Sequence, residues 1–485
     1  MASTSGENKV ACFLSSAEQA AKTILETVKE DEFVHVFSHL DADGVAAAGI
    51  IGKALCRLDA RFRIRITQWI EEKIVGEILS DKPKLVIFTD LGSGYVDLLT
   101  EKLSNFKIVV LDHHQVVGEA PDNFVHVNPH VHGIDGAREI SGSGVAYFVA
   151  RAMDKANMDL APVAVVGALG DLQDRYDQRM LNGLNEKIVE DAIATGLLTV
   201  EKDLIFFGRE TRPIHRTLAS TTSPFIPGIS GEEDKSLAFL KSLGIEAKHG
   251  EKWRALRDLS EDEKKRLCSK LADHLVSKGL HYEVSNLIGS VYVLNNEEPW
   301  TPLRDAREFA VLLNATGRME KAGLGVAVCM GDRASALEEA NQVLEDYRKT
   351  INKYLTWVME KPERMKEFEN IYVVNGEDFI ADKIVGAVSS ILSSSLPNPE
   401  KPLIAYANVE GEGIAKISAR TMDTVINKGV NLGQVMQIAA EKFLGKGGGH
   451  NIAAGAQVPE EDIDKFIDLV NELVGKQIKG EKIGS

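Results

Sequence analysis

The stretch KIVVLDHHQ, residues 107–115, places three side chains that can bind metals in consecutive positions. Asp112, His113 and His114 come directly after four apolar or β-branched residues, which predict a buried strand. Carboxylate oxygens and imidazole nitrogens together form a mixed ligand set that suits Mn²⁺ or Mg²⁺ better than the thiolate-rich sets of structural zinc do. The end of this strand is therefore a candidate metal site.

Acidic side chains and a histidine also follow two other predicted strands: they are His39, Asp41, Asp43 and Asp90. The two aspartates of DADG stand one residue apart, so both can face one crevice, with Gly44 allowing a tight turn. On its own this motif fits a helix N-cap equally well. Together with Asp90 and LDHH it predicts two neighbouring cations, which need a bridging carboxylate and can clamp the attacking and leaving oxygens of a phosphoryl displacement.

A further carboxylate, Asp171, stands in VVGALGDLQDR, residues 165–175. It follows a run of small and apolar residues that could approach the sheet closely as a helix. The segment alone fits a helix C-terminus with solvated acids as well, and Asp174 is interpreted as a surface charge. Asp171 is therefore a fourth candidate piece, whose role depends on the other three.

The elements that must position these residues alternate between strands and helices. Short β-rich runs are expected at 33–38, 62–67, 84–89 and 107–111, with helical spacing at 44–58 and 95–103. This order predicts an α/β fold with a mostly parallel sheet. Ligands bind at the carboxyl ends of the strands in such sheets, so the candidate residues are expected to share one edge.

The rest of the chain predicts an insertion, a connector and a second, smaller α/β domain. Highly charged sequence with helical spacing predicts a helical insertion at 190–285. Apolar residues three or four apart from 336 to 360 predict one long amphipathic helix. Strands are expected at 371–376, 403–410 and 414–420, the last two as a hairpin through GEG. The predicted parts are a catalytic domain (1–189), the helical insertion (190–285), the remainder of the catalytic domain (286–335), a connector helix (336–368) and a C-terminal domain (369–485).

Length and composition are those of a multidomain globular protein. The chain has 485 residues, 44% of them hydrophobic, which fits about three domains. No apolar run reaches the roughly 20 residues of a membrane span, and the polar start does not resemble a signal peptide, so the cytoplasm is the expected location. A net charge of −16 argues against coating nucleic acid through the overall field, although a local basic groove is compatible with it.

The ordered motifs DADG, TD, LDHH and GALGD, followed far downstream by GGGHNIAAGA, resemble those of the DHH phosphoesterase superfamily, which includes RecJ exonucleases and type II inorganic pyrophosphatases. LLNATGRM, residues 312–319, and GGGH are similar to the RecJ branch. Within that branch the chain most resembles the archaeal RecJ-like nucleases that associate with the GINS replication complex. The resemblance implies a DHH catalytic domain and a DHH-associated nucleic-acid-binding domain at the C-terminus.

The resemblance also implies roles for individual residues. Asp90 would bridge two divalent ions, with Mn²⁺ favoured and Mg²⁺ as the alternative. The other implied catalytic metal ligands are His39 and Asp41 for one ion, and Asp43, His113 and Asp171 for the other. Asp112 would orient its histidine without binding metal, and His114 would contact the scissile phosphate. Type II pyrophosphatases carry a histidine four residues before the first DxD aspartate, where this chain has Phe37, and this departure favours the RecJ branch.

Three further groups are candidates for binding the substrate. ISGSGVAYFVA, residues 140–150, is a Gly/Ser turn that opens a helix, so Ser141, Gly142 and Ser143 could bind an anion through free N–H groups; an ordinary N-cap is the alternative. By resemblance, Asn314 and Arg318 would face the scissile region. Contacts to phosphate and nucleotide in the C-terminal domain are implied for Arg420, Gly448, Gly449 and His450, although a glycine loop needed only for packing is the alternative there.

The leading hypothesis is a metal-dependent exonuclease that degrades single-stranded DNA from its 5′ end in replication or repair, with RNA as a second candidate substrate. An alternative is a phosphodiesterase for short oligonucleotides or cyclic dinucleotides. Another alternative is a replisome scaffold that binds GINS and, through it, the replicative helicase. His126, His130 and His132 lie close in sequence, but Pro129 breaks helical spacing there and no cysteine supports a zinc site.

Overall fold

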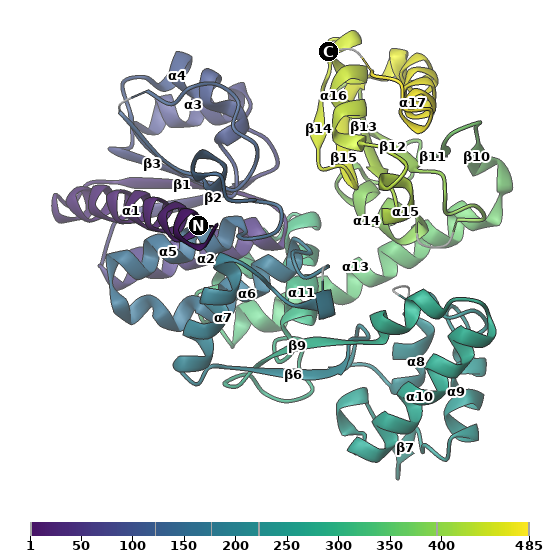
Figure 1. The fold of residues 1–485 in the computed structure, drawn as a ribbon. Helices are drawn as coiled ribbons and strands as arrows, with labels where there is room; N and C mark the ends of the chain where they lie inside the picture. The colour runs from purple at the N-terminus through teal and green to yellow at the C-terminus, as the bar shows by residue number, and fades with distance from the viewer. Residues whose placement is uncertain (1, 122, 176, 222–223, 394–395, 484–485) are drawn as a thin grey trace. The chain divides into compact units, whose positions relative to one another are not determined.

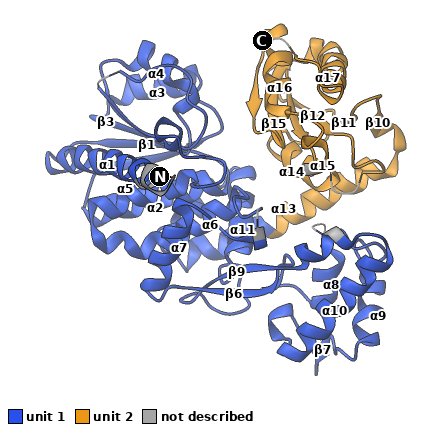
Figure 2. Ribbon diagram, viewed as in Figure 1, with its two compact units in different colours: residues 1–344 blue, residues 345–485 orange. Residues whose placement is uncertain are grey.

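Two compact units make up the chain, residues 1–344 and residues 345–485 (Figure 2). The computed structural model describes residues 2–121, 123–175, 177–221, 224–393 and 396–483. The boundary between the units falls inside α13 (Ser335–Glu360), a single helix where the apolar spacing predicted one. Each unit has its own sheet and is described separately below.

An all-parallel, five-stranded sheet forms the centre of the first unit (Figure 1). Its order is β2–β1–β3–β4–β5, with β1 at Val34–His39, β2 at Phe62–Thr67, β3 at Leu85–Thr89, β4 at Lys107–Leu111 and β5 at Phe124–Val127. The inner strand β3 is buried at every position, as expected for a parallel sheet covered on both faces. The predicted α/β class is confirmed.

Helices cover the two faces of this sheet (Figure 1). One face carries α3 (Glu72–Asp81) and α4 (Val96–Leu103), and the other carries α1 (Ala2–Lys29), α2 (Ala42–Arg57) and α5 (Gly142–Met153). On the side of α3 and α4, Phe37 and Phe88 stack with their ring centroids 5.6 Å apart within an apolar core. Burying each such ring stabilises the fold by about 1.5–3 kcal/mol.

Two further helices pack beside α2, and small residues bring them close. α6 (Ala161–Gly170) consists almost entirely of small and apolar residues, and a Cβ added at Gly170 would lie 2.5 Å from the Cβ of Ala42. α11 (Ala306–Arg318) approaches through Gly317, where an added Cβ would collide with the carbonyl oxygen of Leu40. α6 is therefore held against the start of α2, and α11 is held against the loop that follows β1.

The insertion differs from the entirely helical segment predicted over 190–285. After α7 (Leu184–Ala194), strand β6 (Leu198–Leu204) pairs antiparallel with β9 (Ile288–Leu294), and this ribbon carries the insertion. Most side chains of β6 are charged or polar, so the segment lacks the apolar pattern that predicts a strand. The remaining elements are α8 (Ile214–Ala219), α9 (Glu233–Ser242), the short pair β7 (Lys248–His249) and β8 (Lys252–Trp253), and α10 (Glu261–Ser277).

The second unit contains a six-stranded mixed sheet of order β10–β11–β12–β13–β15–β14. Its strands are β10 (Met365–Glu367), β11 (Tyr372–Asn375), β12 (Leu403–Val409), β13 (Ile414–Arg420), β14 (Lys446–Gly449) and β15 (Ala453–Pro459). The hairpin predicted through GEG is confirmed by the antiparallel pairing of β12 with β13. Helices α14 (Asp382–Ser393), α16 (Leu432–Lys442) and α17 (Ile463–Ile478) belong to the same unit.

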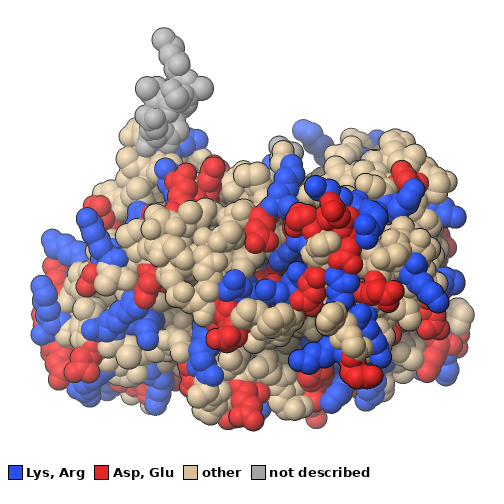
Figure 3. Space-filling model, turned by 90° about the horizontal axis from the view of Figure 1, so that it is seen from below, with Lys and Arg blue, Asp and Glu red and all other residues tan. Residues whose placement is uncertain are grey.

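The surface carries charges of both signs. On the face shown in Figure 3, basic and acidic side chains are interspersed and do not gather into one basic surface. The four cysteines are free thiols, of which Cys12 and Cys56 are exposed and Cys329 is buried. Across the described ranges, no helix combines the length and the apolarity needed to cross a membrane.

Candidate metal centre

The carboxyl ends of β1, β3 and β4 lie level with one another. Ser38 is the register partner of Thr89, and Thr89 is the partner of Leu111. The hydroxyl of Ser38 donates hydrogen bonds toward the carbonyl oxygens of Gly44 (2.6 Å) and Thr89 (3.0 Å), which ties the first two strand ends together. The side chains that follow each strand consequently meet at one edge of the sheet.

Asp90 occupies the middle of this edge. Its backbone has a φ of +56°, a left-handed conformation that is uncommon outside glycine and tolerated best by Asp and Asn. The side chain is 1% exposed, with Oδ1 lying 3.2 Å from His113 Nε2 and Oδ2 lying 3.6 Å from His39 Nδ1. Neither carboxylate oxygen has a hydrogen-bond partner among the described residues. Asp90 therefore presents one unpaired oxygen to each half of the site.

His39 and Asp41 form the first half. Asp41 is the N-cap of α2 through Oδ1, which accepts from the N–H of Gly44, while Oδ2 lies 3.0 Å from His39 Nδ1. Burial alone would raise the pKa of the Asp41 carboxyl, but the adjacent His39 outweighs it and holds that pKa well below its usual range. Asp41 thus caps α2 and also belongs to the first half of the site. Gly44 itself is helical, and a Cβ there would collide with the carbonyl of His39, so close packing explains this glycine better than the expected tight turn.

Asp43, His113 and Asp171 form the second half. Nε2 of His113 lies 3.8 Å from Asp43 Oδ2 and 3.7 Å from Asp171 Oδ2. The opposite ring nitrogen, Nδ1, lies 2.7 Å from the carbonyl oxygen of Gly136, to which it donates, so Nε2 is the nitrogen that faces the carboxylates. Burial, followed by repulsion from Asp90, raises the pKa of Asp43 to about 8.

Asp112 orients His114. Its Oδ1 accepts from Nδ1 of His114 at 2.8 Å and from the backbone N–H of both histidines. The ring of His113 is held by Gly136, so the orienting role expected for Asp112 reaches that residue only through the backbone. Burial would lower the pKa of His114, but the charge of Asp112 outweighs it and raises that pKa. His114 therefore tends to keep its proton, and its side chain is 45% exposed.

A layer of polar side chains supports these residues, and two of its members, Ser93 and Asn128, were not singled out in the sequence. The N–H of Ser93 donates to Asp112 Oδ2 at 2.8 Å, and its hydroxyl lies 2.8 Å from Nε2 of His126. Nδ2 of Asn128 donates both to this hydroxyl and to the carbonyl oxygen of His114. Because Ser93 Oγ accepts from Asn128, its own proton is available for His126. His126 thus supports the site from behind.

Glycines let these layers approach. A Cβ added at Gly142 would lie 2.7 Å from the Cβ of Asp90, and one added at Gly167 would lie 2.5 Å from Asp43 Oδ1 and collide with the hydroxyl of Ser143. Neither position has space for a larger residue. The small-residue run before Asp171 therefore packs closely against α2 and α5, whereas its composition had predicted a close approach to the sheet.

Comparisons with known proteins agree with this arrangement. Family models match at residues 33–169 (DHH family, N-terminal domain), 206–288 (DHH-CID domain) and 370–476 (DHHA1 domain). The uncharacterized protein MJ0831 of Methanocaldococcus jannaschii is 31% identical over 474 residues, which cover 96% of this chain and 99% of that protein. The chain belongs to the DHH phosphoesterase superfamily.

RecJ proteins are among the similar members of this superfamily. The single-stranded-DNA-specific exonuclease RecJ of Bacillus subtilis is 23% identical over 472 residues, which cover 96% of this chain and 48% of that protein. The crystal structure of Thermus thermophilus RecJ in complex with Mn²⁺ superposes with a TM-score of 0.58 at 18% identity, covering 95% of this chain and 55% of that one. This chain therefore spans about half the length of these two RecJ proteins.

The predicted anion site at the start of α5 already holds a carboxylate of the DHH centre. The N–H groups of Gly142 and Ser143 donate to Asp43, at 2.6 Å to Oδ2 and 3.0 Å to Oδ1. Ser141 caps the helix by accepting from the N–H of Gly144. All three residues are buried, and the helix N-terminus fixes the orientation of Asp43. Their direct contact with substrate stays a prediction.

Asn314 and Arg318 lie beside the first half of the DHH centre. Oδ1 of Asn314 accepts from the N–H of Ala42 at 3.1 Å, at the start of α2. The charge of Arg318 is among the influences that lower the pKa of Asp41, which places the guanidinium near that carboxylate. α11 thus brings Asn314 and Arg318 of the NATGRM motif to the site, although both are distant in sequence from the other site residues.

Four candidate residues belong to the second unit and lie at one end of its sheet. Arg420 pairs in register with Ala453, and Gly449 pairs with Ala454. His450 follows β14 and donates its N–H to the carbonyl of Ala453. Gly449 has a φ of +133°, which favours glycine, whereas a Cβ at Gly448 would meet open space. The DHHA1 sheet therefore gathers Arg420, Gly448, Gly449 and His450 locally.

Asp174 differs from the sequence interpretation. It is 1% exposed and forms an ion pair with Arg307 on α11, at 2.5 Å between Oδ2 and Nη2. The interpretation of Asp174 as a surface charge is therefore wrong. The sequence near Asp174 could not predict the ion pair, because Arg307 lies 133 residues away. The pair links the segment after Asp171 to α11.

Proposed function

We propose that this chain is a two-metal phosphodiesterase that degrades single-stranded nucleic acid as an exonuclease, with DNA cut from the 5′ end as the leading substrate. The observation that carries this proposal is the position of Asp90. One buried, unpaired oxygen of this carboxylate faces His39 and Asp41, and the other faces His113. A bridging ligand between two cations requires this placement.

The donor set fits two divalent cations. Buried carboxylate oxygens without a hydrogen-bond partner are costly, so the two oxygens of Asp90 point to missing positive charge. Cation-binding groups of three are formed by His39, Asp41 and Asp90, and by Asp43, His113 and Asp171. The set contains only oxygen and imidazole nitrogen, which favours Mn²⁺ with Mg²⁺ as the alternative.

When bound, two such cations would polarise the phosphate and lower the pKa of a water molecule near the site. The side chains of this chain then have distinct tasks. Asp41 and Asp43 hold their carboxylates in fixed orientations, because Gly44, Gly142 and Ser143 donate backbone hydrogen bonds to them. His114 is anchored by Asp112 through Nδ1, so Nε2 is the nitrogen available to donate to a phosphate oxygen as negative charge develops.

Similarity to RecJ supports nucleic acid as the substrate. The B. subtilis relative is named a single-stranded-DNA-specific exonuclease, and its similarity runs through nearly the whole of this chain. The DHHA1 unit adds an arginine, a histidine and closely approaching glycines at one sheet end, where backbone and side-chain donors can contact a phosphate. Scarce aromatic residues, at 6% of the chain, favour backbone contacts over an extended stacking platform.

The test is hydrolysis of single-stranded DNA and RNA labelled at either end, with and without Mn²⁺, by the wild type and by Asp41→Ala. We expect stepwise release of mononucleotides from the 5′ end of DNA, dependent on Mn²⁺ and lost in the variant. Hydrolysis of dinucleotides but of no polymer would favour the small-substrate alternative. A folded, Mn²⁺-bound protein without any hydrolysis would favour the scaffold.

Gly167→Ala is expected to weaken Mn²⁺ binding by roughly 10- to 100-fold, as loss of the support around a metal ligand typically does. The added methyl group would displace Asp43 or the hydroxyl of Ser143, and overpacking of this kind costs about 1–3 kcal/mol. Isothermal titration with Mn²⁺ measures the change. Gly76→Ala is the matched control, because a Cβ there meets nothing within 4 Å in α3. Equal Mn²⁺ affinity in the Gly167 variant and the wild type would contradict this role.

Stabilisation by Mn²⁺ is expected to grow as the pH rises from 5.5 to 7.5. Without metal, the pKa of Asp43 is raised by burial to about 8, so the stability that this carboxyl contributes is present at low pH and is lost as pH rises toward 8. Cations bind the deprotonated carboxylate, so affinity rises by up to about tenfold per pH unit for each proton displaced. The shift of Tm on adding Mn²⁺ measures this effect. An equal shift at both pH values would contradict it.

Association with GINS is a prediction from the family resemblance, with the insertion as the proposed docking surface. Leu204 and Ile288 are register partners, so residues 205–287 can be replaced by a short hairpin turn with the β6–β9 ribbon retained. We expect that this deletion removes binding of purified GINS while Mn²⁺ binding persists. Binding that survives the deletion would exclude the insertion as the docking surface.

A further inference from the structure

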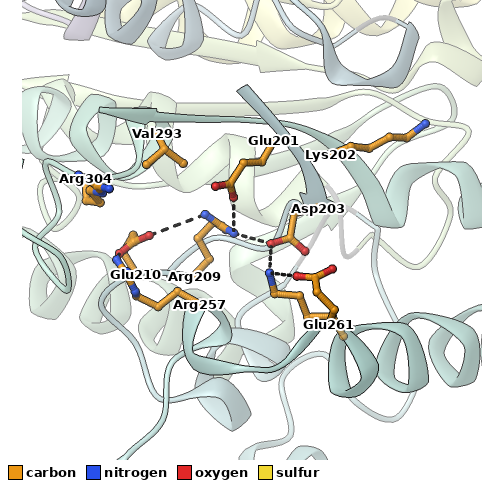
Figure 4. A pocket seen from close by; sticks show the side chains of 10 residues that line it. Glu201, Lys202, Asp203, Arg209, Glu210, Arg257, Glu261, Val293 and Arg304 are labelled. Carbon is orange, nitrogen blue, oxygen red and sulfur yellow. Dashed lines mark hydrogen bonds and ion pairs between the residues drawn. The ribbon is translucent and has the colours of Figure 1, made fainter. Parts of the chain in front are cut away.

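A second charged cavity lies apart from the DHH centre, where the β6–β9 ribbon meets the insertion (Figure 4). It has a volume of about 480 Å³ and ten lining residues, of which only Val293 is uncharged. Five of the others are basic and four are acidic, so the lining has a net positive charge. Its side chains come from β6, the following loop, the short turn at Leu256–Asp258, the start of α10, β9 and the segment after β9.

The acidic side chains of this cavity are all engaged by its basic ones. Asp203 Oδ2 lies 2.5 Å from Arg209 Nη2 and 2.8 Å from Lys264 Nζ. Glu210 Oε2 lies 2.5 Å from Arg257 Nη1. The other two are more loosely paired: Glu261 with Lys264 at 3.2 Å and Glu201 with Arg209 at 3.8 Å. Figure 4 shows this network around Arg209.

The unsatisfied groups are on the basic side. The Nε atoms of Arg209 and Arg304 are buried without a hydrogen-bond partner, and no buried side-chain oxygen of the lining lacks one, among the residues that the structure describes. Arg304 Nη1 donates only to backbone carbonyls, and this guanidinium forms no ion pair with a carboxylate in the described part of the chain. The lining therefore has two donors for which it offers no acceptor, and one more positive than negative charge.

We propose that this cavity binds a small phosphate-bearing anion. Arginine guanidinium groups present paired N–H donors that match phosphate oxygens, and the Nε atoms of Arg209 and Arg304 are the unpaired donors of this lining. The volume lies within the range of small-molecule sites, and an almost purely charged lining excludes an apolar ligand. Inorganic phosphate and a nucleoside monophosphate share this chemistry. The inference does not depend on the activity proposed for the DHH centre.

The position of the cavity predicts what binding does. Arg209 and Arg257 belong to the insertion, whereas Arg304 follows β9, so one anion would connect the two segments. Glu210 continues the link, because its N–H donates to Glu308 of α11 at 2.8 Å. A ligand that bridges these elements in the folded state raises the temperature of unfolding, and above its Kd the stabilisation grows with the logarithm of the ligand concentration.

The test uses the full chain with divalent cations removed by EDTA, in a His114→Ala background that weakens phosphate binding at the DHH centre. Inorganic phosphate and AMP are titrated separately by calorimetry and by thermal unfolding. We expect saturable binding of one anion per chain and a raised Tm. Arg304→Gln should weaken binding about ten- to hundredfold, the loss expected for a hydrogen bond to a charged group. Tighter binding of AMP than of inorganic phosphate would identify the ligand as a nucleotide. Equal affinities would show that the phosphate group alone is recognised.

Two controls keep the outcome decisive. Arg57→Gln removes an arginine that pairs with Asp159 outside the cavity and should leave phosphate binding unchanged. If Arg304→Gln fails to fold, Val293→Met takes its place. This substitution extends an apolar side chain into the cavity without removing a charge, and it should weaken phosphate binding. Absence of saturable binding at millimolar phosphate, binding that requires divalent cations, or equal affinity in the wild type and a folded cavity variant would overturn the proposal.

Discussion

Asp90→Asn is expected to lower the rate of phosphodiester hydrolysis by about 10³-fold or more. The proposed centre depends on one carboxylate with an unpaired oxygen toward each half, and asparagine offers one weaker acceptor and an N–H donor in its place. Metal-assisted stabilisation of the transition state is worth several kcal/mol, and about 4 kcal/mol corresponds to roughly 10³-fold in rate. Single-turnover hydrolysis with saturating Mn²⁺ measures the loss.

The same variant should bind fewer Mn²⁺ ions than the wild type while remaining folded, because the unfavourable crowding of Asp43 by Asp90 is relieved. Asp273→Asn is a suitable control, since this α10 aspartate is exposed and pairs, among the described residues, with the nearby Lys270. Hydrolysis within tenfold of the wild-type rate by Asp90→Asn would exclude a bridging role.

His114→Ala is expected to lower kcat by about 10²- to 10³-fold, the usual effect of removing one donor to developing negative charge. In contrast to Asp90→Asn, Mn²⁺ stoichiometry should be unchanged, because Nδ1, the His114 nitrogen on the side of Asp90, is engaged by Asp112. Parallel measurements of kcat, KM and bound Mn²⁺ separate the two roles. An unchanged kcat, or a lost metal ion, would contradict the assignment of His114 to the phosphate.

Much of the first unit could be predicted because its information is local. The strands before the site residues alternate with helices, and β2 and β4 begin and end at the predicted residues. The polar residues stand directly after these strands, and the parallel register brings strand ends to one level. The two sets of candidate ligands meet for this reason, although their occupancy by metal stays a prediction.

The remaining features depend on contacts between distant segments. Ser93 and Asn128 are common turn residues in sequence, and their place behind Asp112 follows only from the packing of the loops after β3 and β5. Asp174 looks solvent-exposed until Arg307 of α11 is placed beside it. Most side chains of strand β6 are charged or polar, and its pairing with β9 joins residues on either side of the whole insertion. Hydrophobic periodicity within one segment does not predict contacts of these kinds between distant segments.

The positions of metal ions in crystals would decide whether Asp90 joins two cations. Crystals grown with Mn²⁺ and measured at the manganese absorption edge should show two anomalous peaks per chain, about 3.5–4 Å apart, with one oxygen of Asp90 bound to each. One ion should also contact His39 or Asp41, and the other Asp43, His113 or Asp171. A single peak, or two peaks that Asp90 does not join, would contradict the proposed two-metal centre.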